Sequence, residues 1–199
     1  MITLFSNFIR WGAITTMLAG ALSILIGVLS AIEEGDYSMV ESTRWVVLVA
    51  GLAGLYLYLR RSGGFGRVGA VGFYILIVAC VLNAIGYASL LLNEGGVWMR
   101  LYNIFTAVGA LSGLFGQVLF GISILRTGNL PRPGAWLWLV SVPIFLGAIV
   151  GFIVGASGIW SSWSFVVGEV VFGLGCIILG YGLWSHKAES PQPARPGAG

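Results

Sequence analysis

The stretch SFVVGEVVFGLGC, Ser164–Cys176, decides the fold class of this chain. Its side chains are apolar or small except for Glu169, and it lies within a longer apolar run, 162–184. About 20 mostly apolar residues are enough for a helix to cross the hydrocarbon core of a bilayer. We therefore expect a membrane-spanning helix here, and the open question is what surrounds its glutamate.

Composition extends this prediction to the whole chain. Of its 199 residues, 58% are hydrophobic and only 9% are charged, with a mean hydropathy of +0.96. A soluble domain carries about 25% charged residues, so this balance excludes an ordinary soluble protein. The net charge of +3 is interpreted as an orientation signal in the loops, and no nucleic-acid partner is expected.

Six apolar runs are long enough to span a bilayer. They predict an all-α, polytopic transmembrane bundle of six helices, formed by residues 1–187 as one domain. The last residues, 188–199, are small, polar and proline-rich, which is typical of a disordered tail. The first run is expected to be an uncleaved helix, because its apolar stretch is too long for a signal peptide. The expected spans are 8–32, 40–59, 68–92, 101–125, 135–156 and 162–184.

Charges between the spans predict the orientation. With both termini cytoplasmic, eight of the ten basic residues fall inside, and only Arg44 and Arg100 fall outside. This is the bias of the positive-inside rule, so we expect both ends in the cytoplasm. All eight tryptophans lie near expected span ends, as an interfacial aromatic belt predicts.

Arginines in the two long inner loops are candidates for contacts with anionic lipid head groups. The first of these loops contains GFGRVG, residues 64–69, which imitates a dinucleotide-binding motif. That motif requires a preceding strand, whereas here a membrane helix precedes it. The alternative is that the arginines serve only as orientation signals. The five candidates are Arg60, Arg61, Arg67, Arg126 and Arg132.

Glycines at four-residue spacing predict close approach of helices, since small residues let helix backbones meet in lipid. Such stripes serve packing within one chain or between two copies, and we favour packing within the chain. The expected packing glycines are Gly109, Gly113, Gly147, Gly151, Gly155, Gly173 and Gly180.

No pattern in the sequence indicates catalysis, a metal or a cofactor. GASG, Gly155–Gly158, imitates a serine-protease motif, but the single histidine, His186, is expected at the opposite side of the membrane from Ser157. The spans contain no cluster of metal ligands, and both cysteines lie in apolar runs as expected packing residues. We therefore expect a protein that is not an enzyme and has no cofactor.

Glu169 is the most informative single residue, because an ionisable group within the bilayer costs about 2.5–3.5 kcal/mol on insertion scales. It shares a helix stripe with Gly173, Cys176 and Gly180, so its side chain should face another helix. Polar residues of other spans are expected at comparable depth or nearer the inner side. The candidate site comprises Glu169, Asn83, Tyr87, Ser23, Thr106 and Gln117.

Three hypotheses for Glu169 stay open. It is a protonated, hydrogen-bonded structural group, a proton or cation site, or an anchor for a partner subunit or an amphiphilic ligand. We favour an accessory or structural protein that packs through glycine-rich faces with membrane lipids, with itself as a homo-oligomer, or within a larger membrane complex. The alternative is a small transporter or channel for a proton, cation or small amphiphile that uses Glu169.

Three segments resemble those of small six-helix integral membrane proteins of high-GC and thermophilic bacteria, a group with no assigned activity. They are LAGLYLYLRRSGGFGRVGAVGF (52–73), ILRTGNLPRPGAWLWL (124–139) and LGYGLWSHK (179–187). The resemblance implies a six-helix fold in the bacterial inner membrane, and it assigns no role to any residue.

Overall fold

The computed structural model describes residues 2–32, 37–63, 65–92, 96–153 and 159–185, which fold into six α-helices with no strand among them. All six are long and apolar enough to cross a membrane, so the predicted all-α, six-span architecture is confirmed. The predicted tail, 188–199, lies outside the described residues. The helices are α1 Ile2–Ile32, α2 Ser38–Arg61, α3 Arg67–Leu92, α4 Val97–Thr127, α5 Arg132–Ile153 and α6 Ile159–Ser185.

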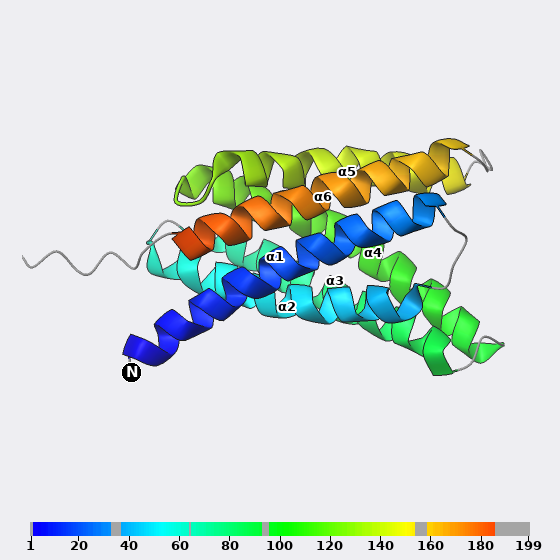
Figure 1. The fold of residues 1–199 in the computed structure, drawn as a ribbon, viewed down its shortest axis with the longest axis horizontal. Helices are drawn as coiled ribbons and strands as arrows, with labels where there is room; N and C mark the ends of the chain where they lie inside the picture. Colours follow the sequence, from blue (N-terminus) through cyan, green and yellow to red (C-terminus); the bar gives the residue numbers. More distant parts are fainter. Residues whose placement is uncertain (1, 33–36, 64, 93–95, 154–158, 186–199) are drawn as a thin grey trace, which may run out of the picture.

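The six helices form a closed ring. Each helix packs against the next one in the sequence, and α1 packs against α6 to close the circle (Figure 1). Successive helices run in opposite directions, so the beginning of α1 and the end of α6 lie at the same end of the bundle. We call this the terminal end, and the other the distal end. The five arginines of the two long loops are all exposed at the terminal end.

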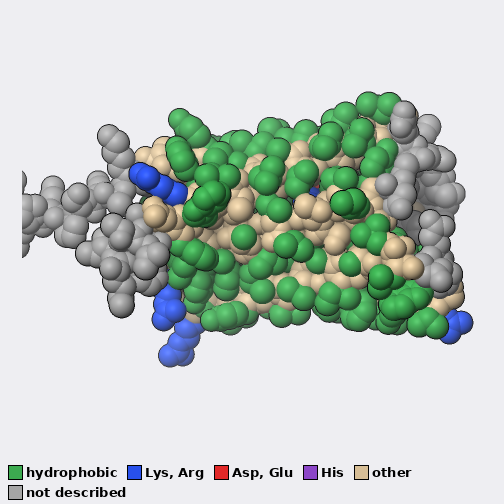
Figure 2. Space-filling model, turned by 60° about the horizontal axis from the view of Figure 1, so that its bottom comes forward, with side chains coloured by type: hydrophobic (Ala, Val, Ile, Leu, Met, Phe, Trp, Pro, Cys, Tyr) green, Lys and Arg blue, Asp and Glu red, His purple; other side chains and the backbone are tan. Residues whose placement is uncertain are grey.

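On the face shown in Figure 2, hydrophobic side chains cover much of the surface between the two ends of the ring, and no acidic side chain is prominent there. Exposed leucines, valines and isoleucines occur on every helix for which side chains are described. Apolar residues are favourable on the outside of a protein only where lipid replaces water as the surrounding medium. The surface therefore agrees with a multi-pass membrane protein.

Glycines bring the helix backbones together within the ring. A Cβ added at Gly54 would lie 2.5 Å from the Cα of Gly12, so α1 and α2 meet backbone to backbone. A Cβ added at Gly173 would lie 2.5 Å from the carbonyl oxygen of Gly20, which places α6 equally close to α1. Such contacts have no room for a side chain, which is the physical reason for glycine at these positions.

The expected packing glycines divide into two groups. Gly109, Gly113, Gly173 and Gly180 all face another helix. Gly147 is exposed, and a Cβ there would meet no atom within 4 Å, which corrects the expectation that it packs within the chain. Gly151, one turn later, is half-buried, and Gly155 lies outside the described residues. The glycine stripe of α5 therefore faces outward at Gly147.

Candidate functional site

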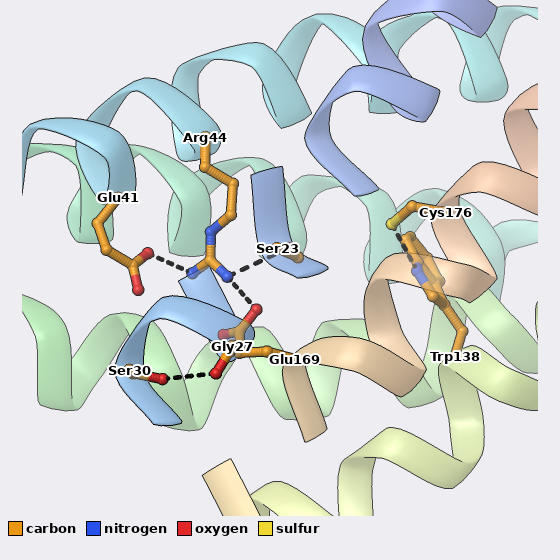
Figure 3. A network of polar contacts seen from close by, with 8 residues as sticks. All are labelled: Ser23, Gly27, Ser30, Glu41, Arg44, Trp138, Glu169 and Cys176. Atoms are coloured by element: carbon orange, nitrogen blue, oxygen red, sulfur yellow. Dashed lines mark hydrogen bonds and ion pairs between the residues drawn. The ribbon is translucent and has the colours of Figure 1, made fainter. Parts of the chain in front are cut away.

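A buried ion triad in the distal half of the ring joins two helices and bonds to a third. Arg44, in the second turn of α2, pairs with Glu169 of α6 and with Glu41 one turn earlier on α2 (Figure 3). Arg44 Nη2 lies 2.6 Å from Glu41 Oε2, and Nη1 donates to Glu169 Oε2 and, at 3.2 Å, to Ser23 Oγ of α1. The three charged residues are only 2–4% exposed. We call Glu41, Arg44 and Glu169 the triad.

Sequence reasoning missed two members of the triad. Glu169 was grouped with Asn83 and Tyr87, and the structure adds Arg44 as its ion-pair partner, with a second buried acid, Glu41, beside them. Arg44 was counted among the charges outside the membrane, yet it lies in α2 and is almost fully buried. The i, i+3 spacing of Glu41 and Arg44, which places both on one helix face, is the signal that could have revealed the pair.

Beside the triad lies a cavity of about 180 Å³ that is lined by α2 to α6. Its wall includes Arg44 and Glu169, and we call it the inner cavity. Five of the six candidate residues from the sequence, Glu169, Asn83, Tyr87, Thr106 and Gln117, line this one cavity. The sixth, Ser23, is joined to it through its hydrogen bond with Arg44. The structure thus brings the expected polar residues of four different spans together around the charged group.

Several polar groups around the inner cavity are satisfied by neighbouring protein atoms. Asn83 Nδ2 donates to the Ala79 carbonyl at 2.9 Å, and Thr106 Oγ1 donates to the Tyr102 carbonyl at 2.6 Å. Gln117 Nε2 donates to the Trp138 carbonyl at 2.6 Å and lies 2.7 Å from Ser141 Oγ. These contacts hold the walls in place and leave those side-chain donors engaged.

Two buried donors, Nε of Arg44 and Nε1 of Trp45, have no hydrogen-bond acceptor. Both residues line the inner cavity. The Arg44 guanidinium carbon lies 4.3 Å from the centroid of the Trp45 ring, so the two groups are neighbours. A buried donor without an acceptor loses about 1–3 kcal/mol relative to its hydrated state.

The remainder of the inner cavity is apolar. Trp138 of α5 stacks on Phe172 of α6 with ring centroids 5.6 Å apart, and Phe145 meets Phe165 edge to face at 6.2 Å. Trp138 was expected in the interfacial belt, but it is fully buried and its Nε1 donates to Cys176 Sγ at 3.1 Å. It belongs to the core because the helix turns its ring inward toward α6.

A second cavity, of about 310 Å³, lies on the distal side of the triad, around the beginning of α2. Polar residues line much of it, and we call it the vestibule. Glu41 lines the vestibule, whereas Arg44 and Glu169 line the inner cavity, and Tyr87 and Phe165 line both. The triad therefore stands between two cavities of different polarity. The other lining residues of the vestibule are Ile26, Ser30, Tyr37, Ser38, Leu90 and Tyr102.

The site offers charge and hydrogen bonding, but no evident catalytic machinery among the residues that the structure describes. Within them, no group of three His, Cys, Asp or Glu residues is placed to hold a metal ion. Both cysteines are buried free thiols, while Ser157 and His186 lie outside the described residues. In comparisons with protein families, curated proteins and solved structures, nothing matches this chain. A function therefore has to be argued from the site itself.

Proposed function

We propose that this membrane protein binds a small molecule, with an apolar body and an oxygen-bearing polar group, in the inner cavity beside Arg44. The observation that carries the proposal is an apolar cavity lined by two residues that each have a buried, unpaired hydrogen-bond donor. A dry cavity of about 150 Å³ accommodates benzene in a protein core. The inner cavity, about 180 Å³, therefore suits a compact molecule of similar size or slightly larger.

The polar group of the ligand is expected to be a hydroxyl or carbonyl oxygen. Arg44 Nε and Trp45 Nε1 both donate and neither accepts, so an oxygen acceptor complements them. A ligand without such an oxygen would leave both donors unpaired. Each hydrogen bond gained contributes about 0.5–1.5 kcal/mol, and bonds to a charged group contribute more. The site should therefore favour an alcohol over an alkane of the same shape.

Entry from the lipid between α4 and α5 fits the arrangement of these helices. Their contacts near the terminal end include Gln117 with Trp138 and Gly121 with Leu139. Toward the distal end α4 crosses away from α5 (Figure 1). There, Ala110 of α4 and Phe145 of α5 both line the inner cavity. A ligand dissolved in the bilayer would reach the site without passing through water, which suits an amphiphile.

Fluorescence quenching tests the proposal, because Trp45 and Trp138 both line the cavity. We expect a short brominated alkanol to quench the purified protein in detergent, and Ala110→Phe, which fills the cavity, to remove the share of the quenching that comes from Trp45 and Trp138. Ala107→Phe is the matched control, since Ala107 lies on the exposed face of the same helix. Equal quenching of wild type and Ala110→Phe would show that the cavity is not the binding site.

A comparison of ligands tests the polar contact. In Trp45→Phe the Nε1 donor is lost while Trp138 still reports quenching. We expect the brominated alkanol to bind this variant several-fold to about tenfold more weakly, as the loss of one hydrogen bond predicts. The matching bromoalkane should bind wild type and variant alike. If both ligands lose affinity equally, the ring and not its N–H group makes the contact.

A structural role as a homo-oligomer or a subunit of a larger complex is the second candidate, and the exposed Gly147 favours it. A bare backbone on the outer face of α5 lets a helix of another chain approach closely. Chemical cross-linking of the protein in native membranes tests this role. A dimer band that Gly147→Leu removes would support it, and a monomer at every protein concentration would oppose it.

Both candidate roles are non-enzymatic and use no cofactor, and lipids are the constant partners. We further propose a bacterial inner-membrane location with both ends cytoplasmic. The exposed arginines at the terminal end support this orientation. They are also placed where anionic head groups of the inner leaflet would meet them.

A further inference from the structure

The triad contains more negative than positive groups. Glu41 and Glu169 share a single cation, Arg44, and these three are the only charged residues that line either cavity among the described residues. With both carboxylates ionised, the site would carry a net charge of −1. An unbalanced charge in a buried site costs several kcal/mol, so a positive charge is needed to balance it.

The vestibule supplies a path by which such a charge can arrive. Glu41 lines this cavity, which reaches the triad from the distal side and holds hydroxyl groups from Ser30 and Tyr102. Glu41 Oε2 contacts Arg44 as an ion pair but has no hydrogen-bond partner, and Figure 3 shows its second oxygen pointing away from Arg44. Water in the vestibule would therefore meet a carboxyl group whose hydrogen bonding is incomplete.

We propose that the triad binds one proton at neutral pH, and that Glu41 exchanges it with water in the vestibule. A hydronium ion in the vestibule transfers its proton to a Glu41 oxygen and leaves a water molecule behind, and release is the reverse. No other bond changes. Because Arg44 contacts both carboxylates, the proton belongs to the pair of acids as a coupled unit.

Among the described groups in and around the triad, Glu41 and Glu169 are the ones that can bind the exchangeable proton. From α1, Ser23 bonds to Arg44 while Ile26 and Ser30 line the vestibule, and α5 contributes only non-titratable residues to the described cavity walls. The remaining neighbours are phenols and thiols, which are weaker acids than a carboxyl group. These neighbours are Tyr37 before α2, Tyr87 and Cys80 of α3, Tyr102 of α4 and Cys176 of α6.

Infrared spectroscopy of the full chain in lipid nanodiscs tests the charge count. A protonated carboxyl absorbs as a carbonyl stretch that a carboxylate lacks. At pH 7, in buffer free of sodium and potassium, we expect this band in a difference spectrum. That spectrum is obtained by subtracting the spectrum of the double variant Glu41→Gln/Glu169→Gln from that of wild type. Either single variant should lose the band, because one carboxylate then pairs with one guanidinium. A single variant that keeps the band, or a wild type that lacks it, would overturn the proposal.

Added alkali cations distinguish a bound proton from a bound metal ion. If a sodium or potassium ion balances the charge in place of a proton, the band will disappear when that salt is added at constant pH. That outcome would overturn the proposal, because it would show that a metal cation and not a proton balances the charge of the triad. If a glutamine variant fails to fold, titration of the wild type alone remains decisive. The band should be present at neutral pH and vanish in alkaline buffer, and a spectrum unchanged across that range would oppose an exchangeable proton.

Transfer into D₂O tests the route. We expect the carbonyl band to shift rapidly in wild type and at least tenfold more slowly in Ser30→Phe, whose ring would fill the vestibule. Within the described residues, the hydrogen bond of Ser30 Oγ is to the Gly27 carbonyl of its own helix, so the change spares the triad. Val28→Phe, at an exposed position of the same helix, is the control. Equally fast exchange in both variants would show that the proton does not pass through the vestibule.

Discussion

Arg44 and Glu169 are 125 positions apart in the sequence, yet the guanidinium of one donates directly to the carboxylate of the other in the interior of the ring. Their contact joins α2 to α6, two helices that are not neighbours around the ring, across the space between them. Ser23 of α1, which packs against both helices, accepts a second bond from the same nitrogen. The ion pair therefore fixes three helices relative to one another at one point.

Removal of the shared cation should be strongly destabilising. Arg44→Ala leaves Glu41 and Glu169 buried without a counter-charge, and breaking a buried ion pair in this way costs about 3–5 kcal/mol. We expect the free energy of unfolding in detergent, measured by denaturant titration, to fall by that amount. Arg100→Ala is the matched control, because Arg100 is exposed and surface changes stay within about 0.5 kcal/mol. A loss for Arg44→Ala as small as that for Arg100→Ala would mean that the triad does not contribute to stability.

The two acids should behave non-additively. Each of Glu41→Gln and Glu169→Gln leaves one carboxylate to balance Arg44, so we expect either single change to cost less than about 1.5 kcal/mol. The double variant leaves a buried cation without a counter-charge, and its loss should exceed the sum of the single losses by 1 kcal/mol or more. A double-mutant cycle of unfolding free energies measures this difference. Simple additivity would show that the acids act independently.

The sequence predicts the membrane architecture well because that architecture depends on local properties. Apolar run length is readable without knowledge of contacts, and six helices long and apolar enough to span a membrane occur. The helices mostly extend beyond the predicted runs: α1 begins at Ile2 instead of residue 8, and α4 covers Val97–Thr127 instead of 101–125. The reason is that helices continue past the apolar segment, so hydropathy underestimates their length.

The site was only partly predictable because its central contact joins distant segments. Depth within the membrane grouped Glu169 with Asn83 and Tyr87, and all three line the inner cavity. Depth could not reveal that the Arg44 side chain points into the ring. Because α2 has the lowest mean hydropathy of the six candidate spans, its first charged residues were interpreted as part of a loop. The same limit applies to glycine: spacing marks small residues, but only the packing shows that Gly54 meets Gly12 while Gly147 meets nothing.

Glycine substitutions should separate packing faces from the lipid-facing surface. Gly54→Ala introduces a Cβ 2.5 Å from the Cα of Gly12, a backbone atom that cannot rotate away, so α1 and α2 must separate. We expect a loss of about 1–3 kcal/mol in unfolding free energy, as for other overpacked interiors. Gly147→Ala meets no atom within 4 Å and should be neutral or stabilising by up to about 1 kcal/mol, since alanine is the better helix former. Equal effects at both positions would argue against backbone contact between α1 and α2.

Gln117 should control how firmly α4 holds α5. Its amide nitrogen donates to the Trp138 carbonyl and lies within hydrogen-bond distance of Ser141 Oγ, which ties the two helices beside the inner cavity. Gln117→Leu removes these bonds and should lower the unfolding free energy by about 1–3 kcal/mol. Amide hydrogen exchange, read by mass spectrometry, should accelerate in α5 more than in α1. Ser112→Ala, which removes only local bonds to Val108 and Gly109 within α4, is the control and should leave exchange in α5 unchanged. If Gln117→Leu accelerates exchange uniformly across all helices, the residue stabilises the bundle as a whole and does not specifically join α4 to α5.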